Sequence, residues 1–441
     1  MNRYKGVVTR IPDPREHRSC IVSRAVLPDD APHTQEYAVT DRQIPSWTEL
    51  KPLLRPKPIE LNATRRRLAD ALTIADLRTV ARKRTPRSVF DYTDGAAEAE
   101  ISLRRARSLF RQLEFQPSIL HDVSHVDPTT DMIGTRSALP FAFAPTGFTR
   151  MMNHEGERAV VRVAERRGIP YALSTMGTTS IEEVAKAGPD AHKWFQLYVW
   201  KDRSAGEDLM ARAKAAGYEA LMLTVDVPVA GARLRDSRNG FSIPPALTAK
   251  TVLDAATHPA WWMNLLTTEP LTFASLSSWS GTVADLLDTL FDPTMTFADL
   301  EWIRESWDGP LIIKGIQTVE DARRVTDAGA DALVLSNHGG RQLDRAPVPL
   351  RLLPDVTEAV GDRTQVWVDT GIMSGADIVA ALALGADATL VGRAYLYGLM
   401  AGGERGVERA VDILEREIRR TMALLGVSTV TELGPQHVRL P

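Results

Sequence analysis

The sequence predicts an α/β fold: an eight-stranded (β/α)8 barrel of the TIM-barrel class, with an N-terminal helical segment and a long insertion after the fourth strand. Two observations support this class. Eight short apolar runs recur after residue 139, and helical stretches such as GERAVVRVAERRG and ADIVAALALG separate them. Alternating strands and helices are typical of a parallel sheet, and eight such repeats can close the sheet into a barrel.

The length, charge and composition of the chain narrow its function. Its 441 residues exceed a usual single domain but accommodate one large barrel with extra segments. Because the net charge is −3 and no long basic block occurs, we expect small-molecule partners and no nucleic acid. The single cysteine, Cys20, excludes an internal disulfide framework and a cysteine-rich zinc site. No apolar stretch of about 18 residues and no signal-peptide pattern occurs, so we expect a cytoplasmic protein.

The first 60 residues differ in composition from the rest. They hold eight of the 27 prolines and show little hydrophobic periodicity. We therefore interpret residues 1–60 as an extended or disordered arm and residues 61–441 as the barrel domain. Just inside that domain, LTIADLRTVARKR predicts a helix capped by Thr73, and Pro86 is placed to open a second helix.

The eight expected strands follow in order. Their sequences are PFAFAPTG from residue 140, PYALSTM from 170, KWFQLYVW from 193, ALMLTVDVP from 220, PLIIKGI from 310, ALVLSNHGG from 332, QVWVDTG from 365 and ATLVGRA from 388. The fourth and fifth runs are separated by residues 229–309, which are too many for one crossover helix. We expect this insertion to form a lid over the face where the strands end.

One stretch of the insertion, residues 255–268, is apolar and contains Trp261 and Trp262. Tryptophan favours the interface of a bilayer, so this stretch could make peripheral contact with the inner face of the cell membrane or meet a quinone. The alternative is that both tryptophans simply cover the barrel. The sequence leaves the two interpretations open.

Polar residues gather where the strands end. Side chains alternate along a strand, so residues two apart share a face. The pairs formed in this way are Gln196 with Tyr198, Thr224 with Asp226, and Ser336 with His338. Because the carboxyl ends of barrel strands build the active site, these groups should meet Lys314 and Asp369 at one mouth. A polar turn explains one such strand end, but it does not explain several that converge.

The residue types at this mouth indicate acid–base chemistry on an anion. The imidazole of His338 can remove a proton near neutral pH, and Asp226 is a plausible partner to orient it. Arg341 offers a planar fork suited to a carboxylate, and Lys314 offers a point charge for a developing anion. The loops after the seventh and eighth strands commonly hold a phosphate in such barrels, so a phosphate-bearing cofactor is implied.

Other chemistries find little support in the sequence. No HExxH motif or close histidine and cysteine cluster occurs, so we expect no metal. The GxSxG nucleophile motif is absent, and the glycine spacing after the seventh strand differs from the GxGxxG pattern of nicotinamide-binding domains.

With these residues assembled, the chain resembles the FMN-dependent L-2-hydroxy acid dehydrogenase and oxidase family over roughly residues 65–440. The motif SNHGGRQLD matches the family signature, and FDYTDGAAE, APTGFTRMMNHEGE, LSTMGTTSIEEV, WFQLYVWKDR, LTVDVP, IIKGI and DTGIMSGADIVAALALGA follow the family order. Within the family, VDVPVAGARLRDSRNGFSIPP and VGRAYLYGLMAGGERG are most similar to bacterial, especially actinobacterial, respiratory L-lactate dehydrogenases.

The resemblance implies a role for each residue at the substrate end. It makes His338 the active-site base and Asp226 its charge partner. The implied substrate contacts are a carboxylate clamp of Arg341 and Tyr92, a contact of Tyr198 with the hydroxyl or developing carbonyl, and closure by Arg233.

The resemblance also implies a set of contacts to FMN along its length. One member of the family pattern is missing, because Met373 stands where many relatives carry an arginine, so Arg393 would carry more of the phosphate contact. The implied FMN-binding residues are Ala144, Pro145, Thr146 and Gly147 against the ring, Ser174, Gln196 and Thr224 at its edge, Lys314 at its pyrimidine side, Ser336 and Asp369 at the ribityl chain, and Gly371, Gly392 and Arg393 at the phosphate.

The function that the resemblance implies is oxidation of an L-2-hydroxy acid, L-lactate first, with electrons passed to a quinone or another respiratory acceptor. It also implies a homo-oligomer, a tetramer in relatives. Alternatives are an oxidase that uses oxygen, a peptide-modifying flavin maturase of the same family, and a non-redox FMN isomerase. The isomerase would need Lys314 and the phosphate loops but not the clamp of Arg341 and Tyr92.

Overall fold

The computed structural model describes residues 44–54, 60–240, 254, 256–274 and 292–441. The chain divides into two compact units, Met1–Ile59 and Glu60–Pro441. Most of the predicted arm lies outside the described residues. Within the described part of the first unit, Ser46 begins one short helix, α1 (Trp47–Leu50), through a capping box with Glu49. This turn of helix was not predicted.

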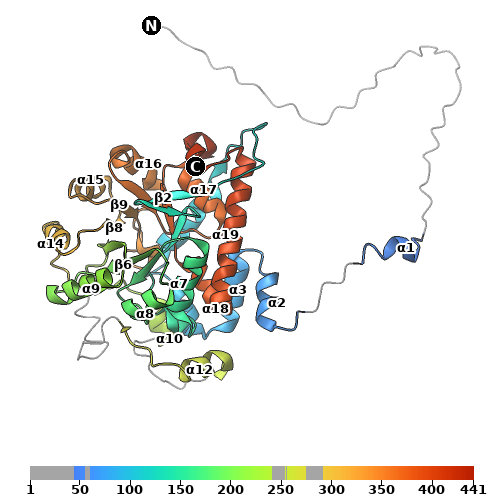
Figure 1. Ribbon diagram of the computed structural model, residues 1–441, viewed down its shortest axis with the longest axis horizontal. Coiled ribbons are helices and arrows are strands. Elements are labelled where there is room, and N and C mark those ends of the chain that lie inside the picture. Colours follow the sequence, from blue (N-terminus) through green and yellow to red (C-terminus); the bar gives the residue numbers. More distant parts are fainter. Residues whose placement is uncertain (1–43, 55–59, 241–253, 255, 275–291) are drawn as a thin grey trace, which may run out of the picture. The chain divides into compact units, whose positions relative to one another are not determined.

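The second unit contains the predicted closed barrel of eight parallel strands (Figure 1). Each apolar run forms one strand, and the order around the barrel is β10-β11-β4-β5-β6-β7-β8-β9. The fold class predicted from the sequence is therefore confirmed. The strands are β4 (Phe141–Phe143), β5 (Tyr171–Ser174), β6 (Lys193–Leu197), β7 (Ala220–Thr224), β8 (Leu311–Ile316), β9 (Ala332–Leu335), β10 (Gln365–Val368) and β11 (Ala388–Val391).

Helices follow the strands and cover the outside of the barrel. Within the described residues, those that follow β4 to β10 are α6 (Thr149–Met152), α7 (Gly156–Arg167), α8 (Ile181–Ala187), α9 (Arg203–Ala215), α10 (Leu234–Asn239), α12 (Pro259–Leu266), α14 (Asp299–Ser306), α15 (Val319–Asp327), α16 (Pro349–Val360) and α17 (Gly375–Ala383). After β11 come α18 (Arg393–Gly402) and α19 (Glu404–Leu425), which Figure 1 shows in orange and red.

In the described part of the second unit, four helices precede the barrel: α2 (Ala63–Asp70), α3 (Ile74–Arg84), α4 (Arg87–Asp94) and α5 (Ile101–Gln112). As predicted, Thr73 caps α3, because its hydroxyl accepts from the Asp76 amide while the Asp76 carboxylate accepts from the Thr73 amide. Pro86 stands at the N-cap of α4, also as predicted. Helix α3 contacts α18, so this helical segment is part of the barrel unit.

The barrel interior below the mouth is filled by side chains. Trp194 and Trp367 stack with ring centroids 5.1 Å apart, and small residues such as Ala172 and Ala332 surround them. A hairpin of β2 (Thr130–Met132) and β3 (Thr135–Ser137) adds Met132 to this cluster. A separate pair, β1 (Glu114–Phe115) with β12 (Val438–Arg439), joins the segment after α5 to the last residues of the chain. The clustered side chains of the interior fill the barrel below its mouth, so a ligand inside the described barrel would have to bind at the mouth.

A bulge in β8 shapes one side of the mouth. The register with β9 shifts between Lys314 and Ile316, and Gly315 between them has φ +110. A Cβ at Gly315 would lie 2.8 Å from the Cβ of Asp226. Glycine is therefore required here, because the bulge brings the backbone of β8 against the Asp226 side chain.

The insertion after β7 is described only in part, since residues 241–253, 255 and 275–291 of the predicted 229–309 segment lie outside the described residues. Its described parts are fixed to the barrel. The indole N–H of Trp261 on α12 donates to the Met151 carbonyl at 2.9 Å, and the rings of Phe273 and Phe148 lie 4.6 Å apart. Trp261 thus packs on the barrel, as expected if the tryptophans of this stretch cover the barrel. Whether the whole insertion acts as a lid stays a prediction.

Candidate active site

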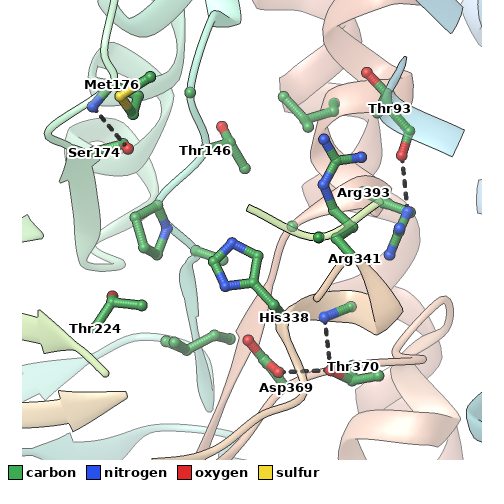
Figure 2. Close-up of a pocket in the computed structure, with 18 of the residues that line it drawn as sticks. Thr93, Thr146, Ser174, Met176, Thr224, His338, Arg341, Asp369, Thr370 and Arg393 are labelled. Carbon is green, nitrogen blue, oxygen red and sulfur yellow. Dashed lines mark hydrogen bonds between the residues drawn. The ribbon is translucent and has the colours of Figure 1, made fainter. Parts of the chain in front are cut away.

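A pocket of about 280 Å³ opens at the mouth of the barrel, where the carboxyl ends of the strands and residues of α4 and α5 line it (Figure 2). All but three of the residues predicted for the site line this pocket. They are Tyr92, Ala144, Pro145, Thr146, Gly147, Ser174, Tyr198, Thr224, Arg233, Lys314, His338, Arg341, Asp369, Gly371, Gly392 and Arg393.

The other three predicted residues lie one hydrogen bond behind the pocket wall. Asp226 bonds the His338 imidazole, Gln196 accepts from the Ser174 hydroxyl, and Ser336 accepts from the Lys314 ammonium. Each therefore supports a side chain that lines the pocket. The expectation that polar strand ends meet at one mouth placed these residues near the pocket. It could not tell which residues line the pocket and which lie behind its wall.

The turn that carries His338 explains the glycines of SNHGGRQLD. His338, Gly339 and Gly340 all have positive φ, and the Asn337 side chain accepts from the Gly340 amide at 2.9 Å. A Cβ on Gly339 would lie 2.5 Å from a terminal nitrogen of Arg393, and one on Gly340 would lie 2.9 Å from the Leu103 amide nitrogen. Only glycine fits both positions, and the turn holds His338 in a conformation that non-glycine residues seldom adopt.

His338 and Asp226 form the acid–base pair of the pocket. The Nδ1 atom of His338 lies 3.0 Å from Oδ1 of Asp226, whose side chain is only 1% exposed. Burial lowers the pKa of His338, and the Asp226 carboxylate offsets only part of this effect. Burial would raise the pKa of Asp226, but His338 and Lys314 outweigh it and hold that pKa below its ordinary value. A neutral imidazole beside an ionised carboxylate is the state of a general base.

Two guanidinium groups face one aromatic ring at one end of the pocket. The Cζ atom of Arg341 lies 4.7 Å from the centroid of the Tyr92 ring, and that of Arg233 lies 5.9 Å from it. Arg341 also donates to the Tyr92 carbonyl. Burial and the charge of Arg233 lower the pKa of Arg341 to about 9. Two like charges held this close in a buried site favour binding of an anion between them.

Tyr198 stands beside these arginines at the end of β6. Burial, with a smaller effect of the Asp226 carboxylate, raises the pKa of its phenol well above the ordinary value. The phenol therefore stays protonated at neutral pH and can donate a hydrogen bond to an oxygen in the pocket.

Lys314 is a further buried cation in the pocket lining. Its ammonium donates to the Ser336 hydroxyl at 2.8 Å and pairs with the Asp369 carboxylate at 3.1 Å. Burial alone would lower the pKa of Lys314, but the Asp369 and Asp226 carboxylates outweigh it and raise that pKa. The lysine therefore remains charged and can stabilise negative charge in the pocket.

Several lining residues were not identified from the sequence. They include Thr93, Leu103, Arg107, Met152, Met176, Val227 and Thr370. Thr93, Leu103 and Arg107 come from helices that precede the barrel, so no strand-end pattern could have indicated them. Thr370 follows Asp369 directly and accepts from the Gly339 amide at 3.1 Å, so its adjacency to a predicted residue was the available signal. Among the described residues, no group of three or more histidine, cysteine or acidic side chains could hold a metal.

Comparison with known proteins assigns the family. A family model described as FMN-dependent dehydrogenase matches residues 81–440. The chain therefore belongs to the FMN-dependent dehydrogenase family, and FMN, the cofactor predicted from the sequence, is confirmed.

Two bacterial relatives cover most of the chain. A Mycobacterium tuberculosis protein named "Putative L-lactate dehydrogenase" is 58% identical over 90% of this chain and 96% of its own length. An L-lactate dehydrogenase of Caulobacter vibrioides is 44% identical over 81% of this chain and 95% of its own length.

Two similar solved structures are of (S)-mandelate dehydrogenase. A crystal structure of a monotopic membrane protein, (S)-mandelate dehydrogenase, matches with a TM-score of 0.81 and 38% identity over 84% of this chain and 100% of that one. A soluble mutant of the membrane-associated (S)-mandelate dehydrogenase of Pseudomonas putida matches with a TM-score of 0.73 and 37% identity, over 84% and 100%.

The inner wall of the pocket fits the edge of a flavin. The Gln196 amide is oriented by its oxygen, which accepts from the Ser174 hydroxyl at 3.0 Å and from the Thr175 amide at 3.3 Å. Its Nε2 atom and the Thr224 hydroxyl are buried and lack a hydrogen-bond partner within the described chain. Buried polar atoms are rarely left unpaired, so these two groups and the charged Lys314 fit the polar edge of a flavin ring.

The part of the pocket lined by Gly392 and Arg393 fits a phosphate. The first turn of α18, which begins at Arg393, has no side-chain cap, so its amides are available to an anion. The start of α17 is different, because Glu417 accepts from the Gly375 amide at 2.8 Å and Asp377 accepts from the Met373 amide at 2.8 Å. The helix terminus that suits a phosphate is therefore that of α18.

Proposed function

We propose that the protein oxidises an L-2-hydroxy acid, with L-lactate as the first choice of substrate, to the corresponding 2-oxo acid. The observation that carries this proposal is the single pocket that holds both the His338–Asp226 pair and the two arginines around Tyr92. An acid–base pair next to a carboxylate site is what a 2-hydroxy carboxylate requires. The names of the two bacterial relatives support L-lactate as the substrate.

The proposed roles of the side chains follow from their positions. Arg341 and Tyr92 bind the substrate carboxylate, and Arg233 closes over the substrate. The protonated Tyr198 donates to the hydroxyl oxygen. His338 takes up the proton that the substrate loses, from the hydroxyl if a hydride moves and from C2 if a carbanion forms. Asp226 stabilises the imidazolium that results, and Lys314 stabilises negative charge on the cofactor side. FMN supplies the chemistry of a two-electron acceptor.

The test is anaerobic reduction of the purified protein. We expect a yellow protein whose visible flavin absorbance is bleached by L-lactate and not by D-lactate. The carboxylate clamp of Arg341 and Tyr92 favours this activity over a non-redox isomerase, which does not need it. A flavoprotein that no L-2-hydroxy acid reduces would overturn the proposal.

We propose that a quinone or another respiratory acceptor, and not oxygen, reoxidises the flavin. The support is the names of the two bacterial relatives and of (S)-mandelate dehydrogenase. A solved structure of mandelate oxidase matches as well, with 38% identity and a TM-score of 0.72, so oxygen is the acceptor to test against. After reduction by L-lactate, the protein is mixed separately with air-saturated buffer and with a soluble quinone analogue. Peroxide formed in stoichiometric amount at the turnover rate, with no gain from the quinone, would make the protein an oxidase.

We propose that α12 provides a peripheral contact with the membrane. This helix carries no charged side chain, and Met263 and Leu266 on it are 62% and 71% exposed. The description of (S)-mandelate dehydrogenase as a monotopic membrane protein supports the proposal. No helix among the described residues is long and apolar enough to cross a membrane.

Vesicle co-sedimentation tests this contact. We expect binding to lipid vesicles to fall in a variant with Met263→Ser and Leu266→Ser. The matched control replaces two other exposed leucines, Leu72 and Leu424, which are 61% and 70% exposed. Equal sedimentation of both variants and the parent would overturn the proposal. We also propose a cytoplasmic location, a tetramer, and a division into an arm of residues 1–60 and a barrel domain of residues 61–441.

A further inference from the structure

The pocket lining carries more positive charge than its own carboxylate balances. Its cationic side chains are Arg107, Arg233, Lys314, Arg341 and Arg393, and its one acidic side chain is Asp369. Asp369 pairs with Lys314, while Arg233 and Arg341 lie around Tyr92 at the proposed substrate end. Two cations, Arg107 and Arg393, therefore remain without a carboxylate in the pocket lining.

Arg107 is held at the cofactor end of the pocket by the packing of α5. Leu103, one turn earlier on the same helix, also lines the pocket. A Cβ on Gly371 would lie 3.2 Å from the Cβ of Ala106 and 3.1 Å from the ring of Phe110. Helix α5 thus packs directly on the loop after β10, and Arg107 projects beside this loop.

The two guanidinium groups differ in how many donors they have left. Arg393 donates from Nε to the Thr93 carbonyl at 2.8 Å and from Nη2 to the Gly95 carbonyl at 2.7 Å, so most of its fork is used. No hydrogen bond or ion pair within the described residues involves the Arg107 guanidinium. Burial lowers the pKa of Arg393, and the positive charge of Arg107 lowers it further. An anion between the two would relieve this repulsion.

The neighbouring loop does not supply a charge of its own. Met373 lines the pocket with a neutral side chain, and its amide is already bonded to Asp377. The Gly375 amide is likewise bonded to Glu417. A dianionic phosphate at this end therefore depends on α18 and on the two arginines.

We propose that Arg107 is a cofactor-binding residue whose guanidinium binds the phosphate group of FMN together with Arg393 and the first amides of α18. The proposal rests on FMN occupying this pocket. It adds a residue from a helix outside the barrel to the phosphate site, and it explains how that site works with a methionine at position 373.

The test is equilibrium binding of FMN and of riboflavin, which lacks the phosphate, to the full-length apoprotein, followed by quenching of flavin fluorescence. We expect Arg107→Gln to weaken FMN binding by about 10-fold to 100-fold, the range for loss of a charge-assisted contact, and to leave riboflavin binding unchanged. Arg107→Lys keeps the charge without the fork and should give a smaller loss. Arg105→Gln, an exposed arginine on the same helix, is the matched control and should bind both ligands as the parent does.

A rescue variant separates charge from structure. Met373→Arg introduced into Arg107→Gln should strengthen FMN binding again without changing riboflavin binding, because it restores a cation at the same end of the pocket. Unchanged FMN binding in Arg107→Gln, or an equal loss for FMN and riboflavin, would overturn the proposal. A parent chain that binds neither FMN nor riboflavin would overturn the cofactor site itself. The riboflavin measurement thus distinguishes failure of the cofactor site from failure of the role proposed for Arg107.

Discussion

Replacing Asp226 with Asn removes one charge from the acid–base pair while preserving its shape. The carboxylate lies 3.0 Å from Nδ1 of His338 and its side chain is 1% exposed, so water screens the pair little. Two unit charges about 4 Å apart attract each other by about 4 kcal/mol at an effective dielectric constant of 20. Because the imidazolium forms only as the proton is transferred, this attraction is lost from the transition state. We expect flavin reduction by L-lactate to slow by about 1,000-fold.

The assay is anaerobic stopped-flow absorbance of the bound flavin at saturating L-lactate, repeated across pH. The neutral asparagine no longer supports the imidazolium, so the pKa of His338 should fall further and the acidic limb of the rate profile should move to lower pH. A purely structural defect would not move this limb. Glu320→Gln, an exposed carboxylate on α15, is the control. Reduction at the parent rate, or an acidic limb that moves to higher pH, would refute the role of Asp226.

Three further experiments address the same pocket. His338→Gln should retain FMN but reduce it about 100-fold to 10,000-fold more slowly, the range for loss of a positioned base; normal single-turnover reduction would remove His338 from the mechanism. Arg341→Lys keeps a charge but loses the fork, so both the substrate Kd and the reduction rate should worsen; a change in neither would contradict the carboxylate site. The pKa of His338 is lowered, so its imidazole should stay neutral below about pH 6.5, the ordinary pKa of histidine. The value of kcat/KM for the parent should therefore stay level as the pH falls past that point. A decline in kcat/KM that begins well above about pH 6.5 would contradict the lowered pKa.

Local sequence patterns were sufficient for the barrel and for the polar residues at the strand ends. The prediction of Tyr92, Arg233 and the residues at the flavin ring and phosphate came from the family resemblance. Each strand is an apolar run that ends in polar residues, and parallel strands of one barrel must present those ends together. This pattern alone predicted that Tyr198, Thr224 and His338 lie at one pocket. The Thr73 cap was equally local, because its partner Asp76 lies three residues away.

What the sequence could not predict depends on contacts between distant segments. The capping of α17 by Glu417 joins residues 42 apart in the chain, and the placement of Arg107 depends on how α5 packs on Gly371. The orientation of Trp261 is of the same kind, since its partner is a carbonyl on α6. Periodicity shows which face of an element is buried, but it does not show which neighbour covers that face.

The ring contacts that begin in the insertion connect the proposed membrane contact of α12 with the shape of the pocket. Phe273 packs against Phe148, and Phe148 lies 6.2 Å from the Tyr92 ring beside the arginines. Phe273, in the described part of the insertion, thus packs behind Phe148, which lines the pocket. Exchanging this part of the insertion between relatives, in evolution or in the laboratory, would therefore be expected to alter substrate selectivity together with the proposed membrane contact of α12. A chimera intended to change only where the enzyme resides should consequently be assayed against a panel of 2-hydroxy acids of increasing size.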